Sequence, residues 1–212
     1  MPLTDDPRCD LVLYTHPWSR GQIARWMLEE TGVPYRQVIL DFGSTMKQEP
    51  YLSINPMGAI PAIDDDGFTL FESLAINLYL ARKAGKLWPR NLQGEGLVYQ
   101  WTLFAATEID PQLGTWYLHT AYLPAEQRKP EVAAGAVPKV AQRFDALERA
   151  IGTRTWLADD TFTIGDLNLA AAMYRAPSFG LDRWPRTRAW LARCYARPAA
   201  QAAVAEREAP AR

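Results

Sequence analysis

The residues best suited to bind a ligand lie in one stretch, residues 55–73. Ile60-Pro61 precedes the short apolar run Ala62-Ile63, and proline has no N–H to give to a β-ladder, so it fits only at the start or edge of a strand. The N–H and carbonyl of Ile60 would then be free for a ligand, and a cis Ile60-Pro61 bond would turn them outward. We therefore predict a binding site built mostly from backbone groups.

Two polar residues, Glu72 and Ser73, stand directly before a helix-like apolar pattern. A helix N-terminus presents unpaired N–H groups and about half a positive charge, so a ligand carboxylate could bind at Ser73 and an ammonium group at Glu72. A ligand with both groups, such as the end of an amino acid, would be held at both points. The same pair is equally consistent with a plain N-cap at Ser73 and a solvated Glu72.

The elements around this stretch follow from hydrophobic patterning. Residues 11–14 have the pattern of a buried strand, residues 23–31 that of a helix, and residues 35–40 that of a second strand, parallel to the first. Residues 41–54 suit a turn and a short helix. Asp66-Gly67 is a hairpin signal between two further strands. The predicted order is β-α-β-α-β-β-α within residues 1–84.

No strand pattern recurs after residues 85–91, which are rich in helix breakers and suit a linker. The second half is predicted to be helical, with Pro111 kinking or ending the first helix and another helix at residues 132–151. Thr163 and Asp166 have the spacing of a capping box. A further helix is indicated around residues 184–194, and the Ala-rich tail is expected to fray.

Composition excludes several classes of function. The chain has 212 residues and a net charge of −1, so no excess of basic residues is present to follow nucleic acid or an anionic membrane. The N-terminus lacks the apolar core of a signal peptide, and no apolar run approaches the roughly 20 residues of a membrane span. Cys9 and Cys194 suit reduced thiols in the cytoplasm, and neither histidine lies near a Cys/His cluster, so we expect no metal site.

Taken in order, four features resemble a cytosolic glutathione S-transferase of bacterial type: the Ile60-Pro61 corner, the Glu72-Ser73 pair, the order of elements, and the helical second half with Thr163-x-x-Asp166. The resemblance covers nearly the whole chain. It implies an α/β thioredoxin-like N-terminal domain (residues 1–84) that binds glutathione, a linker (residues 85–91), and an all-α C-terminal domain (residues 92–212) that shapes the second-substrate pocket. It also implies a cytoplasmic, usually homodimeric, detoxification enzyme that uses glutathione as co-substrate and no metal.

The resemblance assigns roles to individual residues. Ile60 would pair its backbone with the cysteinyl part of glutathione, and the bond to Pro61 would be cis. Glu72 and Ser73 would hold the γ-glutamyl end. Lys47 lies where related proteins often contact the glycyl carboxylate.

The catalytic position is a residue that stabilises the glutathione thiolate. A free thiol titrates near pH 8.5, and a hydroxyl or N–H donor at the start of the first helix would lower that pKa. Ser19, beside Arg20, is the first candidate, although an ordinary N-cap would also place a serine there. Tyr14, Thr15, Trp18 and Arg20 remain open. The loop contains no cysteine, which is unlike the class that forms mixed disulfides with glutathione.

The implied second-substrate pocket is lined by the first-helix loop, including Trp18, and by the helix that carries Trp101, Phe104 and Glu108. Aromatic side chains there suit a flat, hydrophobic electrophile. Taken one by one, aromatic residues at helical spacing more often belong to a core.

The function expected from these residues is attack of the glutathione thiolate on a hydrophobic electrophile. Peroxide reduction, dehalogenation and isomerisation are alternatives within the same chemistry. A non-catalytic binding or regulatory protein with the same fold is the other hypothesis. It is favoured by Ala59, which replaces the long side chain of many relatives, and by the bulky Pro17-Trp18 dipeptide.

Overall fold

A computed structural model describes residues 2–208 of the chain. The chain divides into two compact units. The first contains the residues up to Trp88 together with those from Ala196 onward, and the second is Pro89–Tyr195. Each unit is described by itself.

The first unit is built on a four-stranded sheet in the order β2-β1-β3-β4. Strands β1 (Leu11–Thr15) and β2 (Arg36–Ile39) are parallel, whereas β3 (Ala62–Asp65) pairs antiparallel with β1 and with β4 (Phe68–Phe71). Asp66 and Gly67 join β3 to β4 with φ angles of 54° and 84°, as a tight hairpin turn requires. The predicted strands and hairpin are confirmed.

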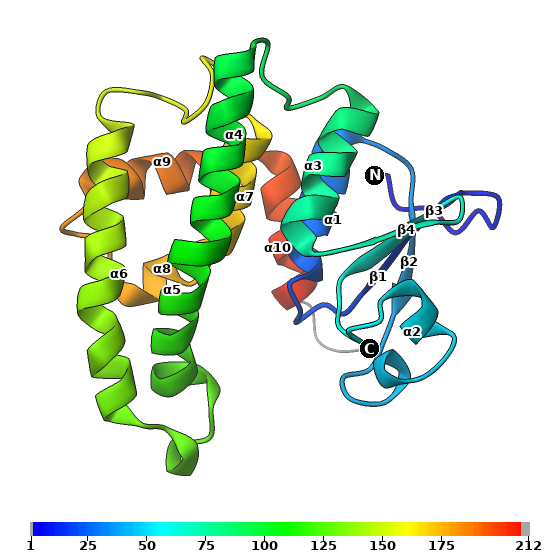
Figure 1. Cartoon of the computed structure of the whole chain (residues 1–212), viewed down its shortest axis with the longest axis horizontal. Coiled ribbons are helices and arrows are strands. Elements are labelled where there is room, and N and C mark those ends of the chain that lie inside the picture. Colours follow the sequence, from blue (N-terminus) through cyan, green and yellow to red (C-terminus); the bar gives the residue numbers. More distant parts are fainter. Residues whose placement is uncertain (1, 209–212) are drawn as a thin grey trace. The chain divides into compact units, whose positions relative to one another are not determined.

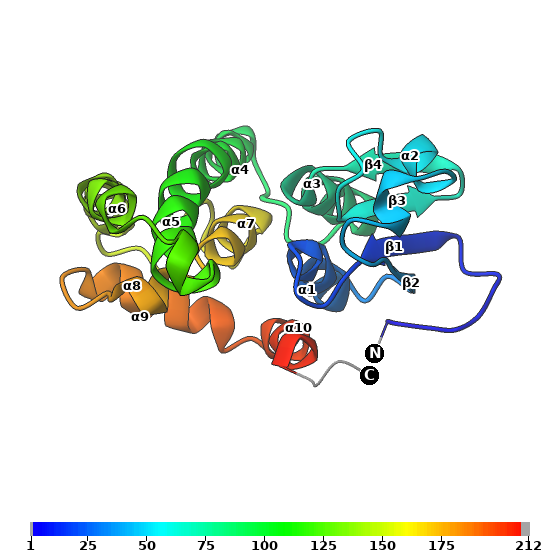
Figure 2. The same cartoon turned by 90° about the horizontal axis from the view of Figure 1, so that it is seen from below.

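Three helices complete the predicted order of this unit. They are α1 (Gly21–Thr31), the short α2 (Tyr51–Ile54) and α3 (Ser73–Ala84). Helix α1 ends at Gly32, whose φ of 70° suits a C-cap glycine. Helices α1 and α3 pack together, and the Asn77 side chain donates to the carbonyl of Ile23 at 3.2 Å. Figure 2 shows these two helices beside the sheet.

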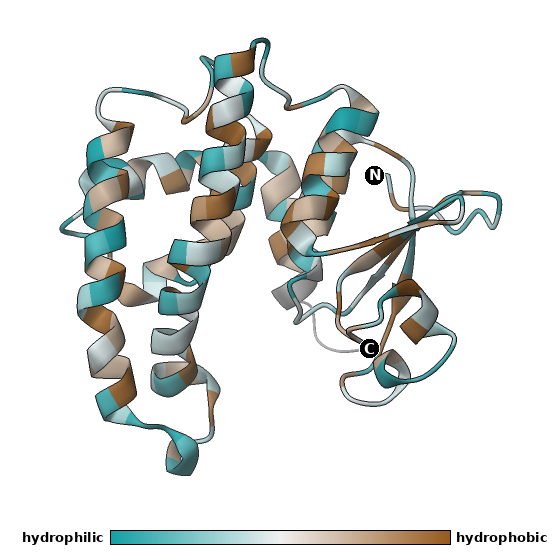
Figure 3. Cartoon of the chain, in the orientation of Figure 1, coloured by the Kyte–Doolittle hydropathy of each residue, from teal (hydrophilic) through white to brown (hydrophobic). Residues whose placement is uncertain are grey.

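The second unit is helical, as predicted. It contains α4 (Leu92–Phe104), α5 (Asp110–Tyr117), α6 (Pro130–Ile151), α7 (Ile164–Ala172), α8 (Ala176–Phe179) and α9 (Pro185–Tyr195). Polar and apolar residues alternate along α6 in Figure 3, and its buried face carries Val140, Phe144 and Leu147. Within the part of the chain that the structure describes, no helix has the length and apolarity to cross a membrane.

Pro111 neither stops the helical path nor lies in the middle of a regular helix. A π-helical segment, Ala105–Ile109, separates α4 from α5, and Pro111 falls in the first turn of α5. Because the helical path continues from that segment, Pro111 lacks the N–H that another residue could donate to it. A second π-helical segment, Leu118–Tyr122, follows α5, and a 3₁₀ turn, Ala125–Gln127, precedes α6.

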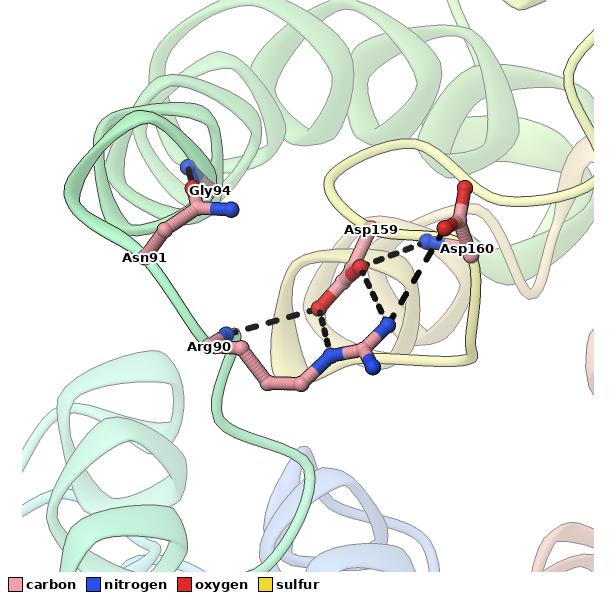
Figure 4. A network of polar contacts seen from close by, with 5 residues as sticks. All are labelled: Arg90, Asn91, Gly94, Asp159 and Asp160. Carbon is pink, nitrogen blue, oxygen red and sulfur yellow. Dashed lines mark hydrogen bonds and ion pairs between the residues drawn. The ribbon is translucent and has the colours of Figure 1, made fainter.

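Side-chain caps fix the starts of the helices in the second unit. The Asn91 side chain accepts from the N–H of Gly94 at 2.8 Å at the start of α4, and the preceding Arg90 pairs with Asp159 at 3.3 Å (Figure 4). The guanidinium of Arg90 lowers the pKa of the Asp159 carboxyl. Asn91 thereby anchors the start of α4, and Arg90 ties it to the chain before α7.

The predicted capping box at α7 is confirmed. Asp166 is fully buried and accepts from the N–H of Thr163 at 3.1 Å, from that of Leu157 at 2.9 Å and from Nε1 of Trp190 at 3.0 Å. Burial raises the pKa of Asp166, while these hydrogen bonds act to lower it. The carboxylate therefore joins three separate segments of the second unit.

The expectation of a frayed tail is wrong for residues 198–208, which form helix α10 (Pro198–Glu208). Helix α10 packs on α1, where Arg197 pairs with Glu30 at 2.6 and 2.8 Å and Ala200 is buried. Residues 209–212 lie outside the described part. The predicted boundaries placed residues 92–212 in the helical domain, whereas the last helix belongs to the first compact unit; those boundaries stay a prediction.

Candidate functional site

The predicted ligand-binding segments meet at one edge of the sheet. Ala62 lies opposite Tyr14 on β1 and opposite Phe71 on β4. The segments just beyond these three positions must therefore be neighbours: the loop at residues 16–20, the Ile60-Pro61 corner and the start of α3. The strand register alone brings together residues about 50 positions apart in sequence.

A side-chain hydrogen bond joins two of these segments directly. Nη2 of Arg20 donates to Oγ of Ser73 at 3.4 Å. Ser73 is buried, with 3% of its surface exposed, at the first position of α3. Because its oxygen accepts from Arg20, the hydroxyl can still donate its own proton to a ligand.

Glu72 precedes the helix in an unusual backbone conformation, with φ 71° and ψ 106°. Residues other than glycine rarely adopt positive φ, at a cost of about 1–2 kcal/mol. The plain N-cap alternative is not observed, because Glu72 occupies the cap position and no side-chain cap bond forms. Its carboxylate is exposed, next to the buried Ser73 hydroxyl.

The Ile60-Pro61 peptide bond is cis, which confirms the prediction. The carbonyl of Ala59 is held by two donors at 2.6 Å, the hydroxyl of Tyr51 and the amide of Asn55. Burial raises the pKa of Tyr51 to about 12, so it stays a donor at neutral pH. Among residues 2–208, neither backbone group of Ile60 takes part in a turn or loop hydrogen bond between backbone atoms.

Lys47 lies beside the turn that leads into this corner. Its ammonium group donates to the carbonyl of Met57 at 3.1 Å, and the side chain is exposed. At Gly58 the φ angle is 53°, and a Cβ there would come within 2.6 Å of the carbonyl oxygen of Met46. Glycine thus permits the turn to pack on the Lys47 segment, and the ammonium retains protons for a ligand.

Ser19 lies just before α1, but its hydroxyl is engaged within its own loop. It donates to the carbonyl of His16 at 2.7 Å and accepts from the N–H of Gly21 at 2.9 Å. The N-cap position of α1 is Arg20, one residue later. The serine therefore shapes the loop, and donating to a thiolate would require its proton to leave the His16 carbonyl.

The alternative donors differ in their access. Thr15 is buried, and its hydroxyl lies 3.5 Å from that of Ser19. Tyr14 lies inside β1, as expected, and burial raises its pKa. Arg20 extends toward Ser73 and brings a permanent positive charge to the site.

An aromatic cluster flanks Ser19. The ring of His16 lies 5.6 Å from that of Trp18 and 4.5 Å from that of Phe42, while 57% of Trp18 and 55% of Phe42 are exposed. The sequence analysis did not predict that Phe42 would lie beside this loop. Its only signal is an aromatic residue in an otherwise polar loop.

The predicted pocket residues of the second unit have packing partners of their own. Trp101 is 5% exposed and meets the ring of Phe104 edge-on at 5.6 Å. Glu108 accepts from Arg143 on α6 at 3.0 and 2.8 Å. Burial of Trp101 favours a core role, and the substrate-pocket assignment of all three stays a prediction. In the described part of the chain, no group of three or more His, Cys, Asp or Glu side chains could hold a metal ion.

Comparison with known proteins places the chain in a family. The glutathione S-transferase N-terminal domain matches residues 10–82, and the glutathione S-transferase C-terminal domain matches residues 113–198. Glutathione S-transferase D7 of Anopheles gambiae is 30% identical over 157 residues, which cover 72% of this chain and 69% of that protein. The chain belongs to the glutathione S-transferase family, and the predicted fold class, a thioredoxin-like domain with an all-helical second domain, is confirmed.

Two further similarities concern function. A glutathione transferase family member from Pseudomonas fluorescens, solved with two glutathione molecules bound, is 28% identical with a TM-score of 0.84 and covers 94% of both chains. Elongation factor 1-gamma of Carassius auratus is 29% identical over 207 residues, or 92% of this chain. The chain spans about half (46%) of the length of that factor.

Proposed function

We propose that this protein is a glutathione transferase whose first unit binds glutathione and holds its sulfur as a thiolate. The observation that carries the proposal is the hydrogen bond from Arg20 to Ser73, which joins the loop before α1 to the start of α3 beside the Ile60-Pro61 corner. Solved relatives with bound glutathione support it.

Each part of glutathione has a complementary group at this edge of the sheet. The α-carboxylate is bound by the hydroxyl of Ser73 at the positive N-terminal end of α3, and the α-ammonium by Glu72. The backbone of Ile60 pairs with the cysteinyl residue. Lys47 binds the glycyl carboxylate.

The thiol lies near the N-terminus of α1, where the helix dipole, the Ser19 hydroxyl and the charge of Arg20 lower its pKa. The thiol proton passes to solvent. The sulfur lone pair then forms a bond to the electrophilic carbon, and the leaving group departs with the electrons of the bond that breaks. Trp18, in the same loop as Ser19, is proposed to contact the hydrophobic electrophile.

A second candidate is a binding or regulatory protein that does not activate the thiol. Two observations favour it. The hydroxyl of Ser19 already donates its hydrogen bond to the carbonyl of His16, and the similarity to elongation factor 1-gamma extends over nearly the whole chain. The first proposal also includes properties that only the family resemblance implies. They are a homodimer, a cytoplasmic location, a detoxification role, membership of the bacterial type and, as an alternative reaction, glutathione-dependent peroxide reduction.

Calorimetric titration of glutathione into the purified protein tests the binding site. Wild type is expected to bind saturably at or below millimolar concentration, and Ser73→Ala to weaken binding about tenfold, because a hydrogen bond to a charged group is lost. Ser53→Ala is the matched control, since that exposed serine bonds to Glu49 on the same unit. Absence of saturable binding at millimolar glutathione would refute the proposal.

A further inference from the structure

Two buried side chains hold the peptide unit that precedes the Ile60-Pro61 corner. The hydroxyl of Tyr51 and Nδ2 of Asn55 both donate to the carbonyl of Ala59 at 2.6 Å. Tyr51 is 3% exposed and Asn55 is 2% exposed, whereas Ala59 lies at the surface. The carbonyl is therefore directed toward these buried groups, and it cannot turn away without losing two hydrogen bonds.

The two donors are held in place by contacts of their own. Oδ1 of Asn55 accepts from the N–H of Met57 at 3.0 Å, and the carbonyl of Asn55 accepts from the N–H of Gly58 at 2.8 Å. Tyr51 is the first residue of α2, and its ring centre lies 5.5 Å from that of Tyr14 on β1. The position of the Ala59 carbonyl is thus tied to the turn and to the sheet.

The planarity of the peptide unit transmits this constraint to Ile60. The carbonyl of Ala59 and the N–H of Ile60 belong to the same peptide unit, and the bond between them is trans. In a planar trans unit the N–H points opposite to the carbonyl, so the N–H of Ile60 faces away from the two buried donors. It has no acceptor in the described part of the chain. The two donors on the carbonyl also polarise the unit, which makes this N–H a stronger donor.

We propose that Tyr51 and Asn55 are positioning residues for glutathione: by holding the Ala59 carbonyl, they direct the N–H of Ile60 at the carbonyl of the cysteinyl residue. This inference rests on the proposed function, which pairs the backbone of Ile60 with that residue. Neither side chain contacts the ligand in this arrangement, because both act through the Ala59 carbonyl. The pair orients the middle of glutathione, whereas the groups at the start of α3 bind its γ-glutamyl end.

Calorimetric titration of two ligands into Tyr51→Phe tests this role. One ligand is glutathione, and the other is an analogue in which a trans alkene replaces the Cys–Gly amide and so removes the cysteinyl carbonyl. Phenylalanine keeps the ring beside Tyr14 but lacks the donor. We expect Tyr51→Phe to weaken glutathione binding about three- to tenfold, and to leave the affinity for the analogue, which has no acceptor for Ile60, within about twofold of wild type.

Tyr79→Phe is the matched control. Its hydroxyl donates to Asp65 at 2.5 Å in the same unit, at the opposite end of β3, so this variant loses a tyrosine hydrogen bond of the same kind. It should be less stable than wild type and bind both ligands like wild type.

The outcomes separate this inference from the proposed function. Wild type that does not bind glutathione saturably at millimolar concentration would refute the proposed function, and the positioning role with it. If wild type binds glutathione, either of two results in folded Tyr51→Phe would overturn the positioning role alone. One is an unchanged affinity for glutathione, and the other is an equal loss of affinity for glutathione and for the alkene analogue.

Discussion

At the scale of single residues, Glu72 combines an exposed carboxylate with a backbone conformation that side chains rarely adopt. Strain of this kind persists where the surrounding structure imposes it, and it is typical of ligand-binding positions. Asp66 also has positive φ, at 54°, but in the hairpin turn away from the ligand-binding edge. A comparison of variants at these two positions therefore distinguishes the effect of backbone strain on stability from the effect of the Glu72 side chain on ligand binding.

We expect Glu72→Gly to leave the free energy of unfolding within about 1 kcal/mol of wild type, because relief of strain offsets the flexibility that glycine adds to the unfolded chain. Glutathione affinity should nevertheless fall about tenfold, since the ammonium loses its partner. Asp66→Gly should have a similar effect on stability and none on affinity. Urea unfolding and calorimetry measure both quantities, and unchanged glutathione affinity in Glu72→Gly would exclude the assigned role.

Asp65 gives the first unit a pH-dependent stability. Its side chain is 4% exposed and accepts from Lys83 at 2.6 Å and from the hydroxyl of Tyr79 at 2.5 Å. Burial alone would raise the pKa of Asp65, but these hydrogen bonds outweigh it and lower the pKa. The same contact raises the pKa of Tyr79 to about 12, so the tyrosine remains a donor.

A carboxyl group with a lowered pKa in the folded state stabilises the fold above its unfolded-state pKa, about 3.9 for aspartate, and loses that effect as the pH falls through the folded value. We therefore expect the free energy of unfolding of wild type to decrease below about pH 4. Asp65→Asn should be less stable by about 1–3 kcal/mol at pH 7 and less sensitive to acid. Urea unfolding between pH 7 and pH 3 measures this, with the 95% exposed Asp182, as Asp182→Asn, for control. An acid dependence equal to that of wild type in Asp65→Asn would contradict the assignment.

The site could be predicted from sequence where its chemistry is local. The hairpin at Asp66-Gly67, the corner at Ile60-Pro61 and the polar pair before α3 each follow from neighbouring residues. The Arg20 to Ser73 bond could not be predicted, because it depends on the register of three strands. Helical periodicity likewise could not show that Trp101 is buried, with 5% of its surface exposed.

At the scale of elements, helix α10 shows how packing outweighs the tendency of a terminus to fray. Alanine has high intrinsic helix propensity, yet a helix of about this length is marginal alone. Contact with α1 supplies the rest: Glu30, with a side chain 7% exposed, accepts from Arg197 and from Nε1 of Trp26 at 3.0 Å. A sequence pattern cannot reveal a partner some 167 residues away.

Arg197→Met should lower the free energy of unfolding by about 1–3 kcal/mol, because it removes both hydrogen bonds that Arg197 donates to the buried carboxylate of Glu30. Arg193→Met is the comparison, since Arg193 makes an exposed bond to the carbonyl of Thr155 at 3.1 Å; its effect should stay within about 0.5 kcal/mol. Chemical unfolding measures both. Equal effects would show that the pair with Glu30 does not anchor α10.

At the scale of the whole molecule, the proposed glutathione site belongs to one of the two compact units. The first unit holds every residue assigned to glutathione. Family membership is established by similarity to glutathione S-transferases. The similarity to elongation factor 1-gamma covers 92% of this chain, against 72% for glutathione S-transferase D7, and that factor is not named as a transferase. Whether the sulfur of bound glutathione is a thiol or a thiolate at neutral pH decides between the two proposed functions.

The most direct measurement is a pH titration of glutathione bound to the purified protein, followed by thiolate absorbance in the ultraviolet. The account predicts a thiol pKa clearly below the free value of about 8.5, and a return toward that value in Ser19→Ala, with Ser53→Ala as control. A lowered pKa that survives Ser19→Ala would transfer the role to Thr15, Trp18 or Arg20. Glutathione that binds with the pKa of the free thiol would contradict the catalytic account and leave a binding protein with this fold.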